Sequence, residues 1–142
     1  MYARPRLTAL TDRLRTAYDG FGRGDIDAVL AAMDSGIEWD ASDALAHTGV
    51  YHGHEGVREY IESLSSAWDE FHLSAEQFTE SGDGAHLMVL GSVRGKLAAS
   101  GQEVEARFAH VLQLDEHGKV MRLKVCLDRE AALREMPESQ AS

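Results

Sequence analysis

The sequence lacks most features that tie a protein to an oxidising compartment or to a membrane. It contains one cysteine, Cys126, which cannot form a disulfide within the chain. Residues 1–14 carry arginines among scattered apolar side chains and lack the unbroken apolar run of a signal peptide, and no stretch is long enough to span a bilayer. We therefore expect a cytoplasmic protein with no membrane partner.

Positive charge is also scarce. The chain has 14 Lys and Arg against 24 Asp and Glu, so its formal net charge is −10. A surface of this sign repels the phosphate backbone of nucleic acids and anionic lipid headgroups. We therefore expect no nucleic acid partner.

The chain length of 142 residues suits one domain. A chain of about this size buries roughly two-thirds of its unfolded surface, which is enough for a core without disulfides. We predict a single domain over residues 1–142, with its core at about residues 7–136 and frayed termini.

The apolar residues change along the chain from a helical period to a strand period. Steps of three and four predict helices over three segments: 7–21, 26–33 and 55–68. Alternation predicts a short strand at 37–41 and then four longer strands: 71–78, 86–99, 104–114 and 120–127. This order predicts an α+β fold with an antiparallel meander and helices segregated to one face.

Several single residues mark where these elements begin, bend and end. Asp25 and Asp128 are expected to cap the second helix and a closing helix, which Pro137 ends. Gly91 and Gly95 indicate a bend or bulge in the strand that contains them. The long segment between the first strand and the third helix shows no sustained period, as is typical of loops that line a binding site.

Three local signatures carry a resemblance to a known family. They are Gly-Asp-Ile-Asp-Ala at residues 24–28, Tyr-His-Gly-His-Glu-Gly-Val at 51–57, and Asp-Glu-His-Gly-Lys-Val at 115–120. With these signatures in this order, the chain resembles the SnoaL-like branch of the nuclear-transport-factor-2-like (NTF2-like) superfamily over nearly its whole length. The resemblance implies a strongly curved mixed or antiparallel sheet wrapped around a long helix, which makes a cone with an internal pocket.

The same resemblance implies function without a cofactor or metal. The family includes polyketide cyclases, ketosteroid isomerases and epoxide hydrolases, as well as proteins with no catalysis, and fold alone does not choose among them. Its members commonly form homodimers through the outer face of the sheet. We expect Arg107 and Arg122 on that face.

His110 is the first candidate for a functional residue. Alternation places it on one strand face with Phe108 and Leu112, so its imidazole points into an apolar interior. By the resemblance, it falls where ketosteroid isomerases carry the protonated aspartic acid of their oxyanion hole. An unperturbed imidazole pKa of about 6.5 allows acid and base roles near neutrality. The alternative is a core histidine bonded to a neighbouring Tyr or backbone group.

Tyr18, Asp40 and Asp43 are the candidate residues that would assist His110. Tyr18 on the first helix can reach a ligand carbonyl, or can lie at the helix rim. Asp40 and Asp43 are the candidate carboxylates. The pleat turns Asp40 away from the pocket if Trp39 and Ala41 point inward, unless the strand is bulged.

The resemblance transfers incompletely at three other positions. The isomerases' tyrosine falls on Ala17, their general base on Ala41, and the epoxide hydrolases' last-strand aspartate on Val125. Steroid-type isomerisation and epoxide hydrolysis are therefore disfavoured.

Further candidates belong to the pocket wall or to a metal cluster. The expected ligand-binding walls, which ordinary core packing also explains, are Trp39, Tyr51, Phe108, Leu123 and Val125. The sequence His52-Gly-His54-Glu55, with His47 nearby, has metal-binding side chains, but they lie on a loop rather than on one side of a strand. We therefore predict no metal site and no cofactor.

These residues predict a protein that binds a small, largely apolar organic molecule. The expected reaction, if there is one, is cofactor-free acid/base chemistry such as polyketide-type cyclisation, isomerisation or hydrolysis, with His110 handling the proton. The alternative is a non-catalytic ligand-binding or dimerisation module. A second polar group within hydrogen-bond reach of His110 would favour catalysis.

Overall fold

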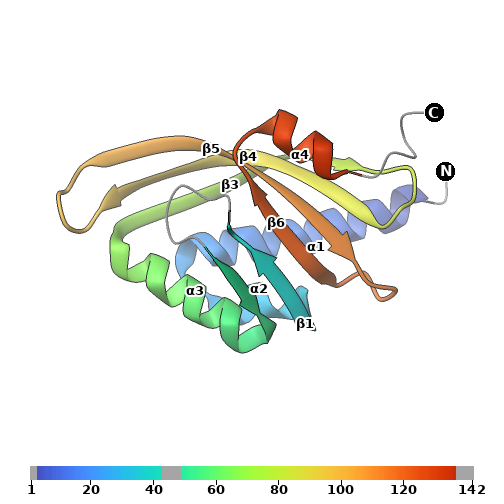
Figure 1. The fold of residues 1–142 in the computed structure, drawn as a ribbon, viewed down its shortest axis with the longest axis horizontal. Helices are drawn as coiled ribbons and strands as arrows, with labels where there is room; N and C mark the ends of the chain where they lie inside the picture. The colour runs from blue at the N-terminus through green and yellow to red at the C-terminus, as the bar shows by residue number, and fades with distance from the viewer. Residues whose placement is uncertain (1–2, 43–48, 137–142) are drawn as a thin grey trace.

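A six-stranded sheet that bends around helix α1 forms the frame of the molecule (Figure 1). The computed structural model describes residues 3–42 and 49–136. The helices are α1 (Ala3–Arg23), α2 (Ile26–Ala31), α3 (Gly53–Ala67) and α4 (Arg129–Glu135). The strands are β1 (Met33–Asp40), β2 (Val50–His52), β3 (Trp68–Glu80), β4 (His86–Leu97), β5 (Glu103–Leu114) and β6 (Val120–Cys126). Within the described residues, no helix is long and apolar enough to cross a membrane.

The strands lie in the order β2-β1-β6-β5-β4-β3. Strands β3 to β6 each pair with their neighbour in sequence in antiparallel direction, and β1 adds to the free side of β6 in parallel. The α+β class, the four-strand meander and the mixed curved sheet are therefore confirmed.

The caps that the sequence predicts are also confirmed. The Asp25 carboxylate accepts a hydrogen bond from Ala28 N at 3.3 Å, and the Asp128 carboxylate accepts one from Ala131 N at 2.8 Å. Each bond satisfies a backbone donor that the first turn of a helix leaves free.

The start of the sheet differs from the prediction. Strand β1 begins at Met33, four residues earlier than expected, and Val50–His52 forms strand β2 within the segment that was predicted to be a loop. In this pair Trp39 lies opposite Tyr51. A strand of three residues is too short to show alternation, so the pairing with β1 decides its conformation.

The sequence indicated a bend or bulge at Gly91 and Gly95 of β4, and the structure has two bulges at this level, with the extra residues on the neighbouring strand β3. The register shifts once between Trp68 and Glu70 and again between Ala75 and Gln77. The β4 glycines lie opposite these sites. A Cβ on Gly91 would collide with the Ser74 carbonyl and lie 2.6 Å from the Phe108 ring, so the glycine allows the close approach. An extra residue on one strand bends and twists the pair.

Apolar residues pack on both faces of the sheet. The larger core lies on the concave face, against α1, α2 and α3. A second cluster lies under α4 on the convex face and contains Met88, Leu90, Ala109, Val111, Cys126, Ala132 and Met136. Figure 1 shows α4 in front of the sheet and α1 behind it. The prediction that all helices share one face is therefore wrong, because α4 covers part of the outer face.

Candidate functional site

A hydrogen bond between His110 and Tyr18 lies at the centre of the concave core. His110 projects inward from β5, and Tyr18 lies on the inner side of α1. The Tyr18 hydroxyl oxygen is 2.8 Å from His110 Nδ1, and the two residues are 7% and 6% exposed. The structure thus places a second polar group beside His110. The contact fits a functional pair, and it also satisfies a purely structural histidine.

Aromatic rings surround this pair. The Phe108 ring lies 4.6 Å from the His110 ring and 5.6 Å from the Tyr18 ring, measured between centroids. The Trp39 ring meets His110 edge-on at 6.4 Å. These contacts remove water from both polar side chains.

Burial keeps both members of the pair neutral. It lowers the pKa of His110 from 6.5 to about 3, and it raises the pKa of Tyr18 well above its ordinary value of 10. Burial disfavours the charged form of each group. The premise that His110 titrates near neutrality therefore does not hold in this environment, and the bond joins a neutral phenol to a neutral imidazole.

The second ring nitrogen of His110 determines what the pair can do. When the Tyr18 hydroxyl donates to Nδ1, the ring proton sits on Nε2, which then donates. Nε2 has no hydrogen-bond partner among the described residues. A neutral N–H donor in an apolar interior can bind a ligand oxygen and stabilise negative charge that develops on it.

Trp39 is the most enclosed of the predicted wall residues, at 2% exposed. Its Nε1 is fully buried and makes no hydrogen bond of standard geometry in the described part of the chain, although it acts on the hydroxyl of Tyr60. Its ring lies 5.3 Å from the Tyr60 ring, which in turn lies 5.0 Å from the Tyr51 ring. Burial and Tyr51 raise the pKa of Tyr60 to about 12, while the Trp39 N–H acts in the opposite direction.

The other predicted wall residues also pack against the concave core. Leu123 is buried, while Tyr51, Phe108 and Val125 are partly buried. A cavity of about 30 Å³ remains in this core, lined by Leu14, Ala17, Tyr18, Phe21, Val29, Ala32, Met33, Trp39, Leu112, Val120 and Leu123. We call it the inner cavity. It has room for a water molecule but not for an organic ligand.

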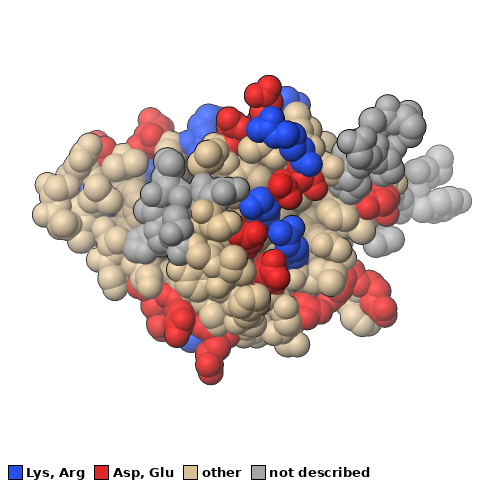
Figure 2. All heavy atoms as spheres, viewed as in Figure 1, with Lys and Arg blue, Asp and Glu red and all other residues tan. Residues whose placement is uncertain are grey.

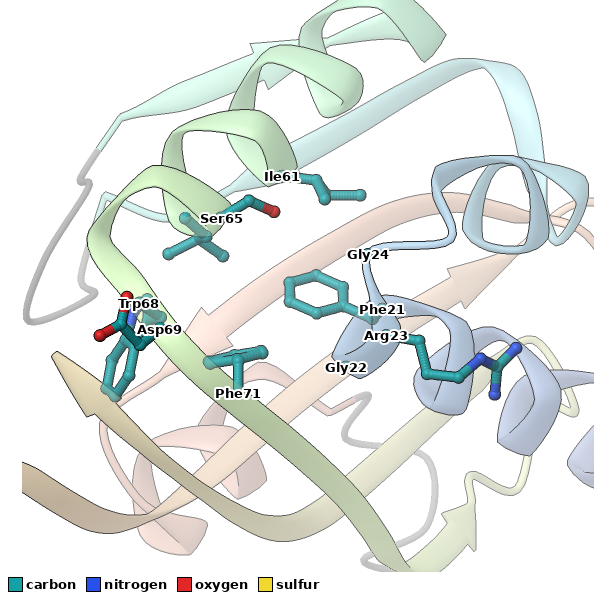
Figure 3. Close-up of a pocket in the computed structure, with 10 residues that line it drawn as sticks. Phe21, Gly22, Arg23, Gly24, Ile61, Ser65, Trp68, Asp69 and Phe71 are labelled. Atoms are coloured by element: carbon teal, nitrogen blue, oxygen red, sulfur yellow. The ribbon is translucent and has the colours of Figure 1, made fainter. Parts of the chain in front are cut away.

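A larger hollow opens where the ends of α1 and α3 meet the start of β3 (Figure 3). Its volume is about 230 Å³, and we call it the outer pocket. Its apolar walls are Phe21, Ile61, Leu64, Trp68 and Phe71, and its polar residues are Arg23, Ser65 and Asp69. The predicted walls did not include these residues. The helical spacing of Tyr18 and Phe21 is the signal that could have placed Phe21 on the same inner side of α1.

The structure does not bring Asp40 to the Tyr18–His110 pair. Its carboxylate lies on the convex face, 3.4 Å from Arg122 Nη2 and 3.6 Å from Lys124 Nζ, and accepts hydrogen bonds from Ser42. Burial raises the pKa of Asp40, but these bonds and charges outweigh burial and lower it. Arg122 also contacts Glu38 at 3.2 Å. Basic and acidic atoms alternate over β1 and β6 in the centre of Figure 2. Asp43 lies outside the described residues.

The histidine-rich entry to α3 does not form a metal cluster in the described residues. His54 Nε2 lies 3.1 Å from the Met33 carbonyl oxygen, to which it donates. His52 is exposed, and His47 lies outside the residues that the structure describes.

Similar proteins share this architecture. A family model described as the SnoaL-like domain matches residues 14–123, whereas no curated protein matches the chain. An NTF2-like protein of unknown function from Burkholderia pseudomallei is 25% identical, with a TM-score of 0.71 over 89% of this chain and 96% of that chain. TerC, co-crystallised with polyporic acid, is 23% identical, with the same TM-score and coverage.

A third structure, a putative polyketide cyclase from Xanthomonas campestris pv. campestris, is 17% identical. Its TM-score is 0.71 over 94% of this chain and 96% of that chain. The structural likenesses extend over nearly the full length of each protein and agree with the family match, which covers more than half of this chain. The chain therefore belongs to the SnoaL-like domain family of the NTF2-like superfamily.

Proposed function

We propose that this protein binds a small, largely apolar organic molecule that carries an oxygen atom, and that the Tyr18–His110 pair hydrogen-bonds that oxygen. The observation that supports the proposal most directly is the buried 2.8 Å contact between the Tyr18 hydroxyl and His110 Nδ1. It fixes the imidazole, and when the Tyr18 hydroxyl donates to Nδ1, it leaves Nε2 as a donor. A pre-oriented donor among aromatic rings suits a flat apolar ligand with a carbonyl or enol oxygen.

The neutral state of the pair limits the reactions that it can support. An imidazole whose pKa is about 3 takes up few protons at pH 7, so it is a weak general base. The buried polar or charged residues of the described chain are Asp40, Ser81 and His110, and Asp40 faces the other side of the sheet. The chemistry that fits is stabilisation of an enolate or similar oxyanion, as in cofactor-free cyclisation or isomerisation.

The relatives agree with this class of ligand and reaction. One similar structure was co-crystallised with polyporic acid, and another is described as a putative polyketide cyclase. Extending these properties to the present chain is part of the proposal, because identities of 23% and 17% show a shared fold alone.

A non-catalytic binding module of the same fold is the second candidate. The observation that favours it is the inner cavity of about 30 Å³, which leaves no room for substrate beside the pair. In that case Tyr18 satisfies a structural histidine, and a ligand binds in the outer pocket alone.

The experiment compares His110→Ala with His117→Ala, which removes an imidazole whose side chain is 77% exposed on the β5–β6 hairpin. The purified protein is examined by native mass spectrometry for a retained organic molecule and titrated with polyporic acid as a probe. Any retained molecule is then tested for conversion to product.

For a catalytic pair, we expect His110→Ala to lower turnover by about 10²–10³-fold, the typical effect of removing an oxyanion donor. His117→Ala should leave turnover unchanged. Full turnover in His110→Ala would refute the catalytic role. Probe binding without any conversion, equal in both variants, would instead support the binding module.

A further inference from the structure

Phe21 separates the outer pocket from the inner cavity. It is the one residue that lines both hollows, which otherwise share no wall residue. Figure 3 shows its ring projecting from the end of α1 into the outer pocket, toward α3. The inner cavity on its other side is lined by Tyr18, the partner of His110.

The ring contacts of Phe21 join the two hollows. Its ring stacks on Trp39, a wall of the inner cavity, with centroids 5.8 Å apart. It also contacts Phe71, a wall of the outer pocket, at 5.7 Å. An aromatic path therefore runs from the outer pocket through Phe21 to the residues around His110. Such a path suits a flat apolar molecule, because aromatic rings stack with offset or edge contacts at these separations.

Phe21 lies between two glycines, Gly20 and Gly22, in the last turn of α1. Each glycine costs a helix interior roughly 1 kcal/mol relative to alanine. The glycines serve close packing: a Cβ on Gly20 would lie 2.7 Å from the Ala28 Cβ. This turn is held by tertiary contacts rather than by helix propensity.

We propose that Phe21 determines how deeply an apolar ligand enters the cone. In the structure as it stands, the ring confines a ligand to the outer pocket of about 230 Å³. Displacement of the ring joins this pocket to the inner cavity and opens the way to the Tyr18–His110 pair. The inference rests on the proposed function and adds a specificity-determining residue to it: bulk at position 21 sets the length of ligand that reaches the pair.

The test uses the positions of the two tryptophans. Trp39 lines the inner cavity and Trp68 lines the outer pocket, so a Trp68→Phe background leaves Trp39 as a single reporter of access to the interior. Acrylamide quenching of Trp39 is measured for Phe21→Ala, Phe21→Leu and Phe71→Ala. Phe71→Ala is the matched control, because it removes a ring of the same size that lines the outer pocket but not the inner cavity.

We expect Phe21→Ala to raise the quenching constant severalfold and Phe21→Leu, which removes less bulk, to raise it less, while Phe71→Ala stays close to the background protein. Circular dichroism and urea unfolding establish that each variant is folded. If acrylamide quenches Trp39 equally in Phe21→Ala and Phe71→Ala, Phe21 does not separate the inner cavity from the outer pocket. Phe21→Leu keeps the test usable if Phe21→Ala does not fold, because an enlarged leucine quenching constant then supports the partition and an unchanged one contradicts it.

A second measurement distinguishes this inference from the proposed function. The probe is 2-naphthol, a flat apolar molecule with one oxygen, titrated by calorimetry. Phe21→Ala should bind it severalfold more tightly, and Phe71→Ala should bind it more weakly. If Phe21→Ala binds 2-naphthol more tightly but adding His110→Ala leaves the affinity unchanged, Phe21 does limit ligand entry, and the Tyr18–His110 pair does not bind the ligand oxygen. If Phe21→Ala gains no affinity, Phe21 does not limit ligand entry.

Discussion

The burial of neutral His110 makes the stability of the fold depend on pH in a defined window. The pKa of His110 is about 3 in the folded protein and 6.5 in its unperturbed state. Between these values the unfolded chain binds a proton that the folded protein does not. Lowering the pH through this window therefore favours the unfolded state, so the stabilisation is present above about pH 6.5 and is lost progressively below it. Replacing His110 with glutamine, which does not titrate, removes this contribution.

The magnitude follows from the width of the window. One extra proton in the unfolded state changes the free energy of unfolding by about 1.4 kcal/mol per pH unit. Because protonation is gradual near pH 6.5, the loss between pH 7.5 and pH 5.0 integrates to about 2 kcal/mol. Other groups titrate in the same range, but they do so in the variant as well. The difference between the wild-type and His110→Gln pH profiles isolates the histidine.

The assay is urea unfolding followed by circular dichroism at several pH values between 7.5 and 5.0. Wild type should lose about 2 kcal/mol more than His110→Gln over this range. His117→Ala, which removes an exposed histidine, should lose as much as wild type. Parallel profiles for wild type and His110→Gln would show that the imidazole is not held neutral. The conclusion that it acts as a neutral hydrogen-bond donor would then be wrong.

Three further substitutions test other contacts. Tyr18→Phe leaves the His110 Nδ1 atom without its partner and should destabilise by about 1–3 kcal/mol in urea unfolding; no change would mean that the bond contributes nothing. Asp40→Asn should cost about 1–2 kcal/mol at pH 7, since the ion pairs are half-buried. The lowered pKa of Asp40 means that this loss should shrink in strong acid, and a constant loss would contradict the ion-pair explanation. Gly91→Ala should cost about 3 kcal/mol or prevent folding, because its Cβ meets the Ser74 carbonyl; a stable variant would show that the strands can separate.

The sequence was sufficient to predict the features of the fold that depend on local periodicity. Alternation along β5 placed His110 inward with Phe108, and the structure has both in the concave core. The helical spacing of α1 likewise put Tyr18 on the inner side. The same pleat argument placed Asp40 away from Trp39, as the structure has it. These predictions held because side-chain direction in a strand or helix follows from position alone.

Features that depend on tertiary contacts were not predictable in this way. The strand pairing of Tyr51, the bulges opposite Gly91 and the place of α4 on the convex face follow from pairing and packing between distant segments. The pKa of His110 depends on how completely other side chains exclude water from it. The volume beside Tyr18 depends on the rotamer of Phe21, which no spacing specifies. For these reasons the sequence indicated one pocket, whereas the structure has the small inner cavity beside Tyr18 and the separate outer pocket.

Stability alone gives little reason for the polar groups in this interior. A buried hydrogen bond between neutral partners contributes only about 1 kcal/mol net, and an apolar pair of the same shape can do as well. Trp39 Nε1 adds a cost, since it is fully buried and makes no hydrogen bond of standard geometry among the described residues. The Trp39 ring lies 6.4 Å from the His110 ring. Under the proposed function, a ligand oxygen bound to Trp39 Nε1 would relieve part of that cost, and this favours an oxygen-bearing ligand over a purely hydrocarbon one.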